Sequence, residues 1–285
     1  MIFWTMPRLP RLVHPPVAGV TALIFFLILK RERQALTRNL RRVSGKRGLV
    51  LHWKVYRVFY SFCDLMVSYC YVPGASHAQL VSMLADKDRG AATIDRCLEA
   101  GNGLIVWTAH LGNPEFASRL LEMHGRPVNV ARVVEDKPAE KMLRDRMATD
   151  RLRIVDLKDG PRATIELLQA LRRNEIVAMQ GDRVYHPRSA VEIPFFSQPA
   201  NFPLGPFLLS QVSGAPVLPG FVIRQGWLRY RVLMDEPIAP AASSDGQAGQ
   251  LAAMRKAVGF LETTLHVHYD QWVNFFDFWP VQPIE

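Results

Sequence analysis

One short segment of the sequence brings together side chains that could move a proton. It reads Thr108-Ala109-His110-Leu111-Gly112-Asn113-Pro114-Glu115. An ionised carboxylate beside an imidazole can hold one ring N–H, fix the tautomer and leave the other nitrogen free as a base. The spacing of His110 and Glu115 therefore predicts a His/Glu pair for general-base catalysis. The alternative is a strand-to-helix turn whose histidine simply meets solvent.

The residues around this pair indicate a strand before His110 and a helix after Asn113. Residues 104–109 form a short, mostly apolar run. Asn113 is a favoured N-cap residue, and Pro114 is favoured at the first helical position. Glu115 then lies in the first helical turn, where unpaired amides and the helix dipole favour its ionised form.

Short apolar runs alternate with longer amphipathic segments through the rest of the chain. We expect strands at 104–109, 128–133, 153–155, 176–179, 217–223 and 228–234, and helices near 114–124, 139–149, 161–172, 202–213 and 250–269. This alternation predicts an α/β fold with a mixed, mostly parallel sheet flanked by helices. Ligands of such sheets bind beyond the carboxyl ends of the strands, so side chains that follow a strand are candidates for the site.

Further polar side chains lie at or just after the ends of predicted strands. They are Arg132, Asp182 and Arg183, and we expect them to bind substrate close to His110, together with Asn113. Guanidinium groups beside a basic nitrogen suit a phosphate-bearing substrate, such as a phosphopantetheine or coenzyme A thioester or a phospholipid head group. Each of these residues alone is also typical of a surface salt bridge.

The stretch 193–221 carries no charge and is rich in Phe and Pro. Such a wall suits an acyl chain, and packing in the core explains it equally well.

The N-terminal part joins an apolar run, 17–29, to a basic block, 30–47, with eight basic residues against one acidic residue. This arrangement predicts that residues 1–47 anchor the chain to an anionic membrane surface, with the catalytic domain at 48–285. A helix over 15–29 would be about 22 Å long, short of the ~30 Å hydrocarbon core, so it forms a short span or lies in the interface. If it spans, the positive-inside rule places the basic block and everything after Lys30 in the cytoplasm. A core helix with a solvated basic face is the alternative.

Composition narrows the class of protein. The chain has 285 residues, of which 49% are hydrophobic, and a net charge of +9. These values exclude a disordered tail and a small disulfide scaffold. The positive charge indicates a negative partner, and its position beside the apolar run favours lipid or an acidic carrier protein over nucleic acid. The three cysteines, Cys63, Cys70 and Cys97, fit small buried side chains.

Two other chemistries lack their motifs. The sequence contains no Asp-x-His, which two-metal phosphoesterases need, so we expect no metal. It also contains no Gly-x-Ser-x-Gly elbow for a serine nucleophile.

The order of several blocks resembles the lysophospholipid acyltransferase superfamily, most of all its late lipid A acyltransferase branch. The blocks are the His110 segment, Gly181-Asp182-Arg183, Phe195-Phe196, Ala215-Pro216-Val217-Leu218-Pro219 and Arg38-Asn39-Leu40. The hallmark His-x4-Asp/Glu occurs here as His110 and Glu115. The resemblance implies transfer of a fatty acyl group from an acyl carrier protein or CoA thioester to a hydroxyl of a lipid or glycolipid. It implies no further cofactor and no covalent enzyme intermediate.

The same resemblance implies roles for the candidate residues. His110 would take the acceptor proton, Glu115 would orient His110, and Arg132, Asp182 and Arg183 would shape the donor and acceptor site. The ending, residues 271–279, lacks the Arg-rich character of the lipid A enzymes and looks like acyltransferases of aryl-polyene-type pigment lipids. We therefore expect an acceptor other than lipid A; the alternative is an aromatic tail that merely packs on the domain. A catalytically silent lipid-binding protein of the same fold would not need both His110 and Glu115.

Overall fold

A six-stranded sheet forms the centre of the structure, which is a computed structural model described for residues 11–86, 90–134, 149–185 and 190–279. Its strands are β1 (Leu104–Thr108), β2 (Val128–Arg132), β3 (Leu152–Asp156), β4 (Ile176–Gln180), β7 (Val217–Gly226) and β8 (Arg229–Met234). They lie in the order β3-β2-β4-β1-β7-β8, and only β8 runs antiparallel to its neighbour. The predicted mixed, mostly parallel sheet is confirmed. The ends of each predicted strand differ from those of the observed strand by at most three residues.

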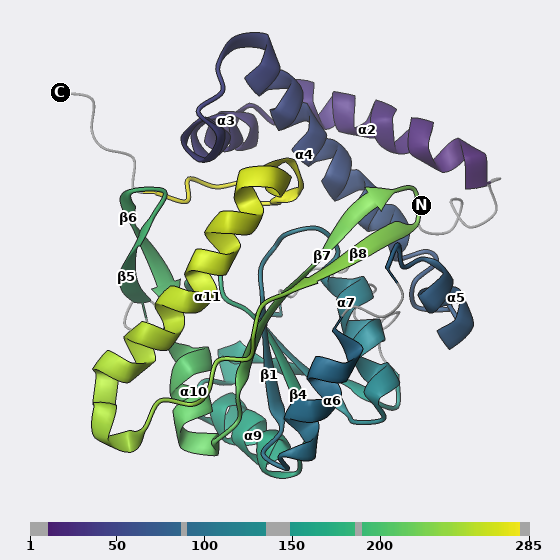
Figure 1. Cartoon of the computed structure of the whole chain (residues 1–285). Helices are drawn as coiled ribbons and strands as arrows, with labels where there is room; N and C mark the ends of the chain where they lie inside the picture. Colours follow the sequence, from purple (N-terminus) through teal and green to yellow (C-terminus); the bar gives the residue numbers. More distant parts are fainter. Residues whose placement is uncertain (1–10, 87–89, 135–148, 186–189, 280–285) are drawn as a thin grey trace.

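Helices cover both faces of this sheet (Figure 1). On one face lie α6 (Ala91–Glu99) and α7 (Pro114–Leu121), and on the other α9 (Pro161–Arg172), α10 (Gly205–Ser213) and α11 (Gly246–His268). The short α5 (His77–Ser82) follows the N-terminal helices. The described residues also form five 3-10 turns: η2 (Arg11–Val13), η3 (Glu122–His124), η4 (Leu157–Asp159), η6 (Ser243–Asp245) and η7 (Tyr269–Gln271). The helix predicted near 139–149 lies outside the described residues, apart from Thr149 at its end.

A hairpin that the sequence analysis missed occupies the first part of the uncharged stretch. It consists of β5 (Ala190–Phe195) and β6 (Gln198–Pro203), joined by Phe196 and Ser197 at φ values of 51° and 58°. Two turn residues with positive φ match the twist of a two-residue hairpin. Because Phe202 and Pro203 belong to β6, α10 begins at Gly205 and not at residue 202.

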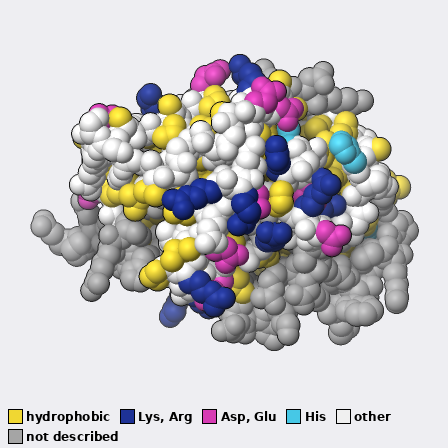
Figure 2. Space-filling view, turned by 90° about the horizontal axis from the view of Figure 1, so that it is seen from below, with side chains coloured by type: hydrophobic (Ala, Val, Ile, Leu, Met, Phe, Trp, Pro, Cys, Tyr) yellow, Lys and Arg dark blue, Asp and Glu magenta, His cyan; other side chains and the backbone are white. Residues whose placement is uncertain are grey.

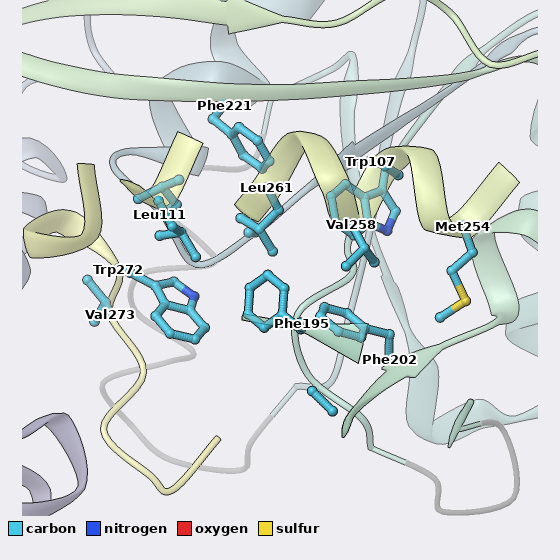
Figure 3. Packing of buried hydrophobic residues seen from close by; sticks show 14 of the residues in the cluster. Trp107, Leu111, Phe195, Phe202, Phe221, Met254, Val258, Leu261, Trp272 and Val273 are labelled. Atoms are coloured by element: carbon cyan, nitrogen blue, oxygen red, sulfur yellow. The ribbon is translucent and has the colours of Figure 1, made fainter. Parts of the chain in front are cut away.

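The main hydrophobic core lies between the sheet, α11 and this hairpin (Figure 3). Trp107 and Phe221 come from the sheet, Leu261 from α11, and Phe195 and Phe202 from the hairpin; all five are at most 1% exposed. Core packing therefore explains most of the uncharged stretch. Of the three cysteines, Cys63 and Cys97 are buried and Cys70 is half-buried.

The N-terminal helices pack onto this same core. They are α2 (His14–Ile28), α3 (Lys30–Ser44) and α4 (Gly48–Ser68), and α2 meets α3 at an angle of 96°. Ala22, Leu36 and Leu40 are fully buried members of the main hydrophobic cluster. Among the described residues no single helix is long and apolar enough to cross a membrane, whereas α2 and α3 taken together meet the requirements of length and composition.

Opposite faces of the molecule differ in surface chemistry. Viewed from below, the face away from α2 and α3 carries basic and acidic side chains interspersed with small apolar areas (Figure 2). The helix α2 contains no Lys, Arg, Asp or Glu. Its outward side instead exposes large apolar side chains: Val20, Leu23, Ile24, Leu27 and Ile28, each 48–62% exposed.

Candidate active site

The carboxyl ends of three neighbouring strands bring the predicted site residues together. His110 follows β1, Arg132 ends β2, and Arg183 follows β4. These strands are parallel neighbours, so their ends share one edge of the sheet. His110, Arg132, Arg183 and Glu115 all line one cavity. Their proximity, expected from the strand pattern, is thus observed; their roles in substrate binding stay predictions.

The imidazole of His110 is held by Asp182. Its Nδ1 lies 2.7 Å from Asp182 Oδ1, and its backbone N–H donates to both oxygens of that carboxylate at 3.1 Å. An ionised carboxylate on Nδ1 favours the tautomer with the proton there, which leaves Nε2 as the basic nitrogen. The His110 side chain is 17% exposed and the Asp182 side chain 0%.

The register of the sheet explains this pairing. Thr108 of β1 lies opposite Gln180 of β4, and the Gly181 N–H donates to the Thr108 carbonyl at 2.8 Å. His110 lies two residues after Thr108, and Asp182 lies two residues after Gln180, so the two side chains leave the sheet side by side. Proximity of this kind does not show in sequence spacing.

Donors from several directions surround the Asp182 carboxylate. Besides His110, the Trp272 indole N–H donates to Oδ2 at 2.9 Å and the Asn274 amide at 3.2 Å. Burial opposes ionisation of this group, but the charges of His110 and Arg183 and the N–H donors outweigh it and lower the pKa of Asp182 to about 2. Asp182 is therefore a carboxylate throughout the neutral range.

Glu115 occupies a different place from the one predicted. Its Oε1 accepts the hydroxyl hydrogen of Tyr69, which follows α4. Its Oε2 is buried and has no hydrogen-bond partner among the described residues. The carboxylate that holds His110 is thus Asp182 and not Glu115. Both His110 and Glu115 face the cavity, so a role for Glu115 toward a bound substrate stays a prediction.

Two glycines allow the close packing around this pair. Gly112 has a φ of +69°, and a Cβ there would lie 1.9 Å from the Val222 carbonyl oxygen. A Cβ on Gly181 would lie 1.9 Å from the Trp107 indole nitrogen. Any larger residue would push His110 or Asp182 out of place.

Asn113, predicted to bind substrate, is a structural residue. Its Oδ1 accepts the Phe116 N–H at 2.9 Å as the N-cap of α7, and its Nδ2 donates to Ser68 and Tyr230. The side chain is 3% exposed and does not line the cavity. The capping role and the bonds to Ser68 and Tyr230 engage its polar atoms, and its predicted role in substrate binding stays a prediction.

The sequence analysis also missed residues that contact the predicted ones. Arg183 donates from Nε to Asn274 Oδ1 at 3.1 Å and from Nη2 to the Val273 carbonyl at 2.8 Å. The two missed residues that contact Asp182 are Trp272 and Asn274, which lie 90 and 92 residues from it in the chain. The only signal in the sequence was the unusual density of aromatic residues after residue 270.

The cavity beside His110 has a volume of about 480 Å³. Its walls come mainly from α4, α7 and the first strands of the sheet, with apolar side chains that include Phe62, Leu65, Val106, Leu120 and Val130. Of the uncharged stretch 193–221, only Gly220 and Phe221 reach it. An apolar chamber with a basic nitrogen at its edge suits an extended hydrocarbon chain with a reactive end.

Comparison with known proteins gives a matching family model and two curated relatives. The family model described as bacterial lipid A biosynthesis acyltransferase matches residues 1–279. Two curated proteins, each called phosphatidylinositol mannoside acyltransferase, from the CDC 1551 and H37Rv strains of Mycobacterium tuberculosis, are 29% identical over 150 residues. The match covers 52% of this chain and 47% of each relative, about half the length of both.

Proposed function

Because the chain belongs to the bacterial lipid A biosynthesis acyltransferase family, we propose that it transfers a fatty acyl group to a hydroxyl of a lipid or glycolipid. One observation carries the proposal: His110, with Nδ1 held by Asp182, lies at the edge of a large apolar cavity. A silent lipid-binding protein would need the cavity but not the hydrogen-bonded pair.

His110 is the general base in this proposal. A hydroxyl is a poor nucleophile until its proton is accepted. Nε2 of His110 takes the proton of the acceptor hydroxyl while the oxygen attacks the carbonyl carbon of an acyl thioester. The C–S bond then breaks, and the departing thiolate takes the proton back from the imidazolium. Asp182 stabilises the imidazolium in between and is not consumed.

Glu115 and the two arginines act on the substrates. The buried Oε2 of Glu115 has no partner within the described protein and can accept the hydrogen of a substrate hydroxyl. Arg132 and Arg183 line the same cavity and suit the phosphate of a phosphopantetheine arm, whether on acyl carrier protein or on coenzyme A. The apolar walls take the acyl chain.

The acceptor is a hydroxylated lipid other than lipid A in this proposal. Val273 and Phe275, from the ending that lacks the Arg-rich character of the lipid A enzymes, line the cavity. The mycobacterial relatives are named for a glycolipid, phosphatidylinositol mannoside, which supports a glycolipid class of acceptor.

An assay with purified protein in detergent tests the activity. Palmitoyl thioesters of coenzyme A and of acyl carrier protein are offered with lipid A precursor, phosphatidylinositol mannoside and a hydroxylated aryl-polyene lipid, and products are read by mass spectrometry. Transfer to any of these hydroxyls supports acyl transfer, and transfer to lipid A precursor alone would refute the proposed acceptor. Donor turnover without an acylated product would refute the transferase.

We also propose that the protein docks on the cytoplasmic face of a bacterial inner membrane through α2. The exposed side of α2 is apolar, and Leu49 and Trp53 at the start of α4 are 89% and 57% exposed. The exposed basic residues Arg41, Lys46 and Arg47 lie at the end of α3 and in the loop that leads to α4. Apolar side chains flanked by basic ones are typical of a surface that binds anionic lipid.

Flotation with anionic liposomes tests this docking. Removal of residues 1–47 would also delete Leu36 and Leu40 from the core, so point variants are the sharper choice. We expect Leu23→Glu with Leu27→Glu to weaken binding at least ten-fold, since each charge opposes burial in the interface. Ile165→Glu on α9 is the matched control, because Ile165 is 56% exposed and α9 lies at the other end of the molecule (Figure 1). Equal binding of the double variant and the control would overturn the docking.

A further inference from the structure

The C-terminal segment, residues 272–279, lies against the loop that carries His110. The Val273 N–H donates to the His110 carbonyl at 2.8 Å, and the Gly112 N–H donates to the Gln271 carbonyl at 3.1 Å. Trp272 and Asn274 are both 0% exposed. These residues are therefore built into the site and do not form a tail on its surface.

Two side chains of this segment converge on one oxygen of Asp182. The Trp272 indole N–H and the Asn274 amide both donate to Oδ2, while His110 Nδ1 lies against Oδ1. Donors on Oδ2 restrict the rotation of the carboxylate and so hold Oδ1 toward Nδ1 of His110. Building on the function proposed above, we propose that Trp272 and Asn274 are positioning residues of the acyl transfer, which act by orienting Asp182 toward His110.

Asn274 has a second task that explains why an amide is required. Its Oδ1 accepts from Arg183 Nε at 3.1 Å, so the amide nitrogen must face Asp182. Arginine pairs readily with a neighbouring carboxylate through two parallel hydrogen bonds. By engaging the guanidinium, Asn274 and the Val273 carbonyl keep Arg183 from competing with His110 for Asp182.

Helix α3 fixes the far end of the segment. Asn39, 1% exposed, donates from Nδ2 to the Phe276 carbonyl at 2.7 Å and accepts the Phe278 N–H at 3.1 Å. Its neighbour Arg38 donates from Nη2 to Asp277 at 2.9 Å. The Arg38-Asn39 pair thus holds the backbone on which Trp272 and Asn274 depend.

A pair of matched tryptophan variants tests the proposal. Trp272→Phe removes the N–H that reaches Asp182, whereas Trp279→Phe removes an N–H that donates to the Phe195 carbonyl at 3.3 Å. Both lose a buried indole from the same segment, so both should lower thermal stability. We expect Trp272→Phe alone to lower kcat about ten-fold or more with KM unchanged, the size of one hydrogen bond to a charged group. Asn274→Asp, which sets a second carboxylate against Asp182, should cost more.

A spectroscopic readout separates positioning from activity. The Nδ1 proton of His110 should give a downfield proton NMR signal, identified by its absence in His110→Gln. We expect this signal to move or broaden in Trp272→Phe and to stay in Trp279→Phe. If Trp272→Phe keeps both the parental kcat and the parental signal, the positioning role is overturned. If the parent protein transfers no acyl group, the proposed function fails, and the signal alone decides whether Trp272 positions Asp182.

Discussion

The two sides of His110 are built in opposite ways. On one side, Asp182 is fully buried, and its two oxygens receive N–H donors from His110, Trp272 and Asn274. On the other side, Glu115 has Tyr69 on one oxygen and, within the described part of the chain, no partner on the other, and apolar walls enclose the cavity. One side is saturated with hydrogen bonds, and the other has capacity left over.

This difference separates the fixed part of the chemistry from the variable part. A base must have one orientation for every turnover, and a saturated network provides it without reorganisation. A substrate must enter and leave, so the groups that meet it need unpaired capacity before it binds. We infer that the Asp182 side sets the rate and the Glu115 side sets what is transferred.

Removal of the base should have the largest effect. General-base assistance is typically worth about 10² to 10⁴ in rate, so His110→Ala should reduce kcat by at least that factor while the fold stays intact. His124→Ala is the matched control, because His124 also lines the cavity and has Nδ1 2.6 Å from a carboxylate, Asp95. That carboxylate is 55% exposed, and among the described residues no set of N–H donors like the one around Asp182 surrounds it. Parental turnover by His110→Ala would end the mechanism.

The next largest effects on kcat should come from the two carboxylates, Asp182 and Glu115. Asp182→Asn keeps the size but removes the charge that holds Nδ1–H, and we expect kcat to fall by about 10² to 10⁴. Glu115→Gln can still accept from Tyr69, so we expect a smaller loss, about 10-fold to 10²-fold, with donor KM little changed. Steady-state kinetics of both variants decide the order. A larger loss in Glu115→Gln would restore Glu115 as the partner of the imidazole.

A change in the cavity should alter selectivity more than rate. Ala117 on α7 lines the cavity and is half-buried. Ala117→Phe would fill part of its volume, and we expect kcat/KM for long-chain thioesters to fall about ten-fold relative to short-chain ones. Donors of eight and sixteen carbons, assayed on the same preparation, serve as each other's control. An unchanged ratio would place the acyl chain elsewhere.

Most of the fold followed from the sequence, because hydrophobic periodicity reports which faces are buried. The parallel strands from 104 to 180 and the helix after Asn113 were predicted from this pattern and from the N-cap. The hairpin β5–β6 was not, since Pro194, Pro199 and Pro203 obscure the strand signal, and the turn at Phe196-Ser197 lacks glycine.

The site was harder to predict than the fold. Register across parallel strands placed Asp182 beside His110, whereas the pair chosen from spacing along the chain, His110 and Glu115, shares a cavity but no hydrogen bond within the described structure. Asn113 shows the converse: the polar atoms of a residue in a motif can all be engaged within the fold, here by the Phe116 N–H, Ser68 and Tyr230. Trp272 and Asn274 reach the site only through tertiary folding after α11.

The smallest effect concerns stability against pH and measures the saturated side without any substrate. The pKa of Asp182, lowered from 3.8 to about 2, means that its stabilising contribution is complete above about pH 4 and is lost as the pH falls toward 2. For a fully buried group this is worth about 2 kcal/mol, so Asp182→Asn should flatten the decline of the unfolding temperature over that window.

Asp64 is the matched control for this prediction, because burial outweighs the charge of Arg224 and raises the pKa of Asp64 to about 6. Its contribution is complete below about pH 4 and is lost as the pH rises to 6, so Asp64→Asn should flatten a slope of the opposite sign. Thermal unfolding in detergent from pH 2.5 to 7, followed by circular dichroism, measures both slopes. An acid slope in Asp182→Asn as steep as that of the parent would mean that the donors around Asp182 do not hold it ionised.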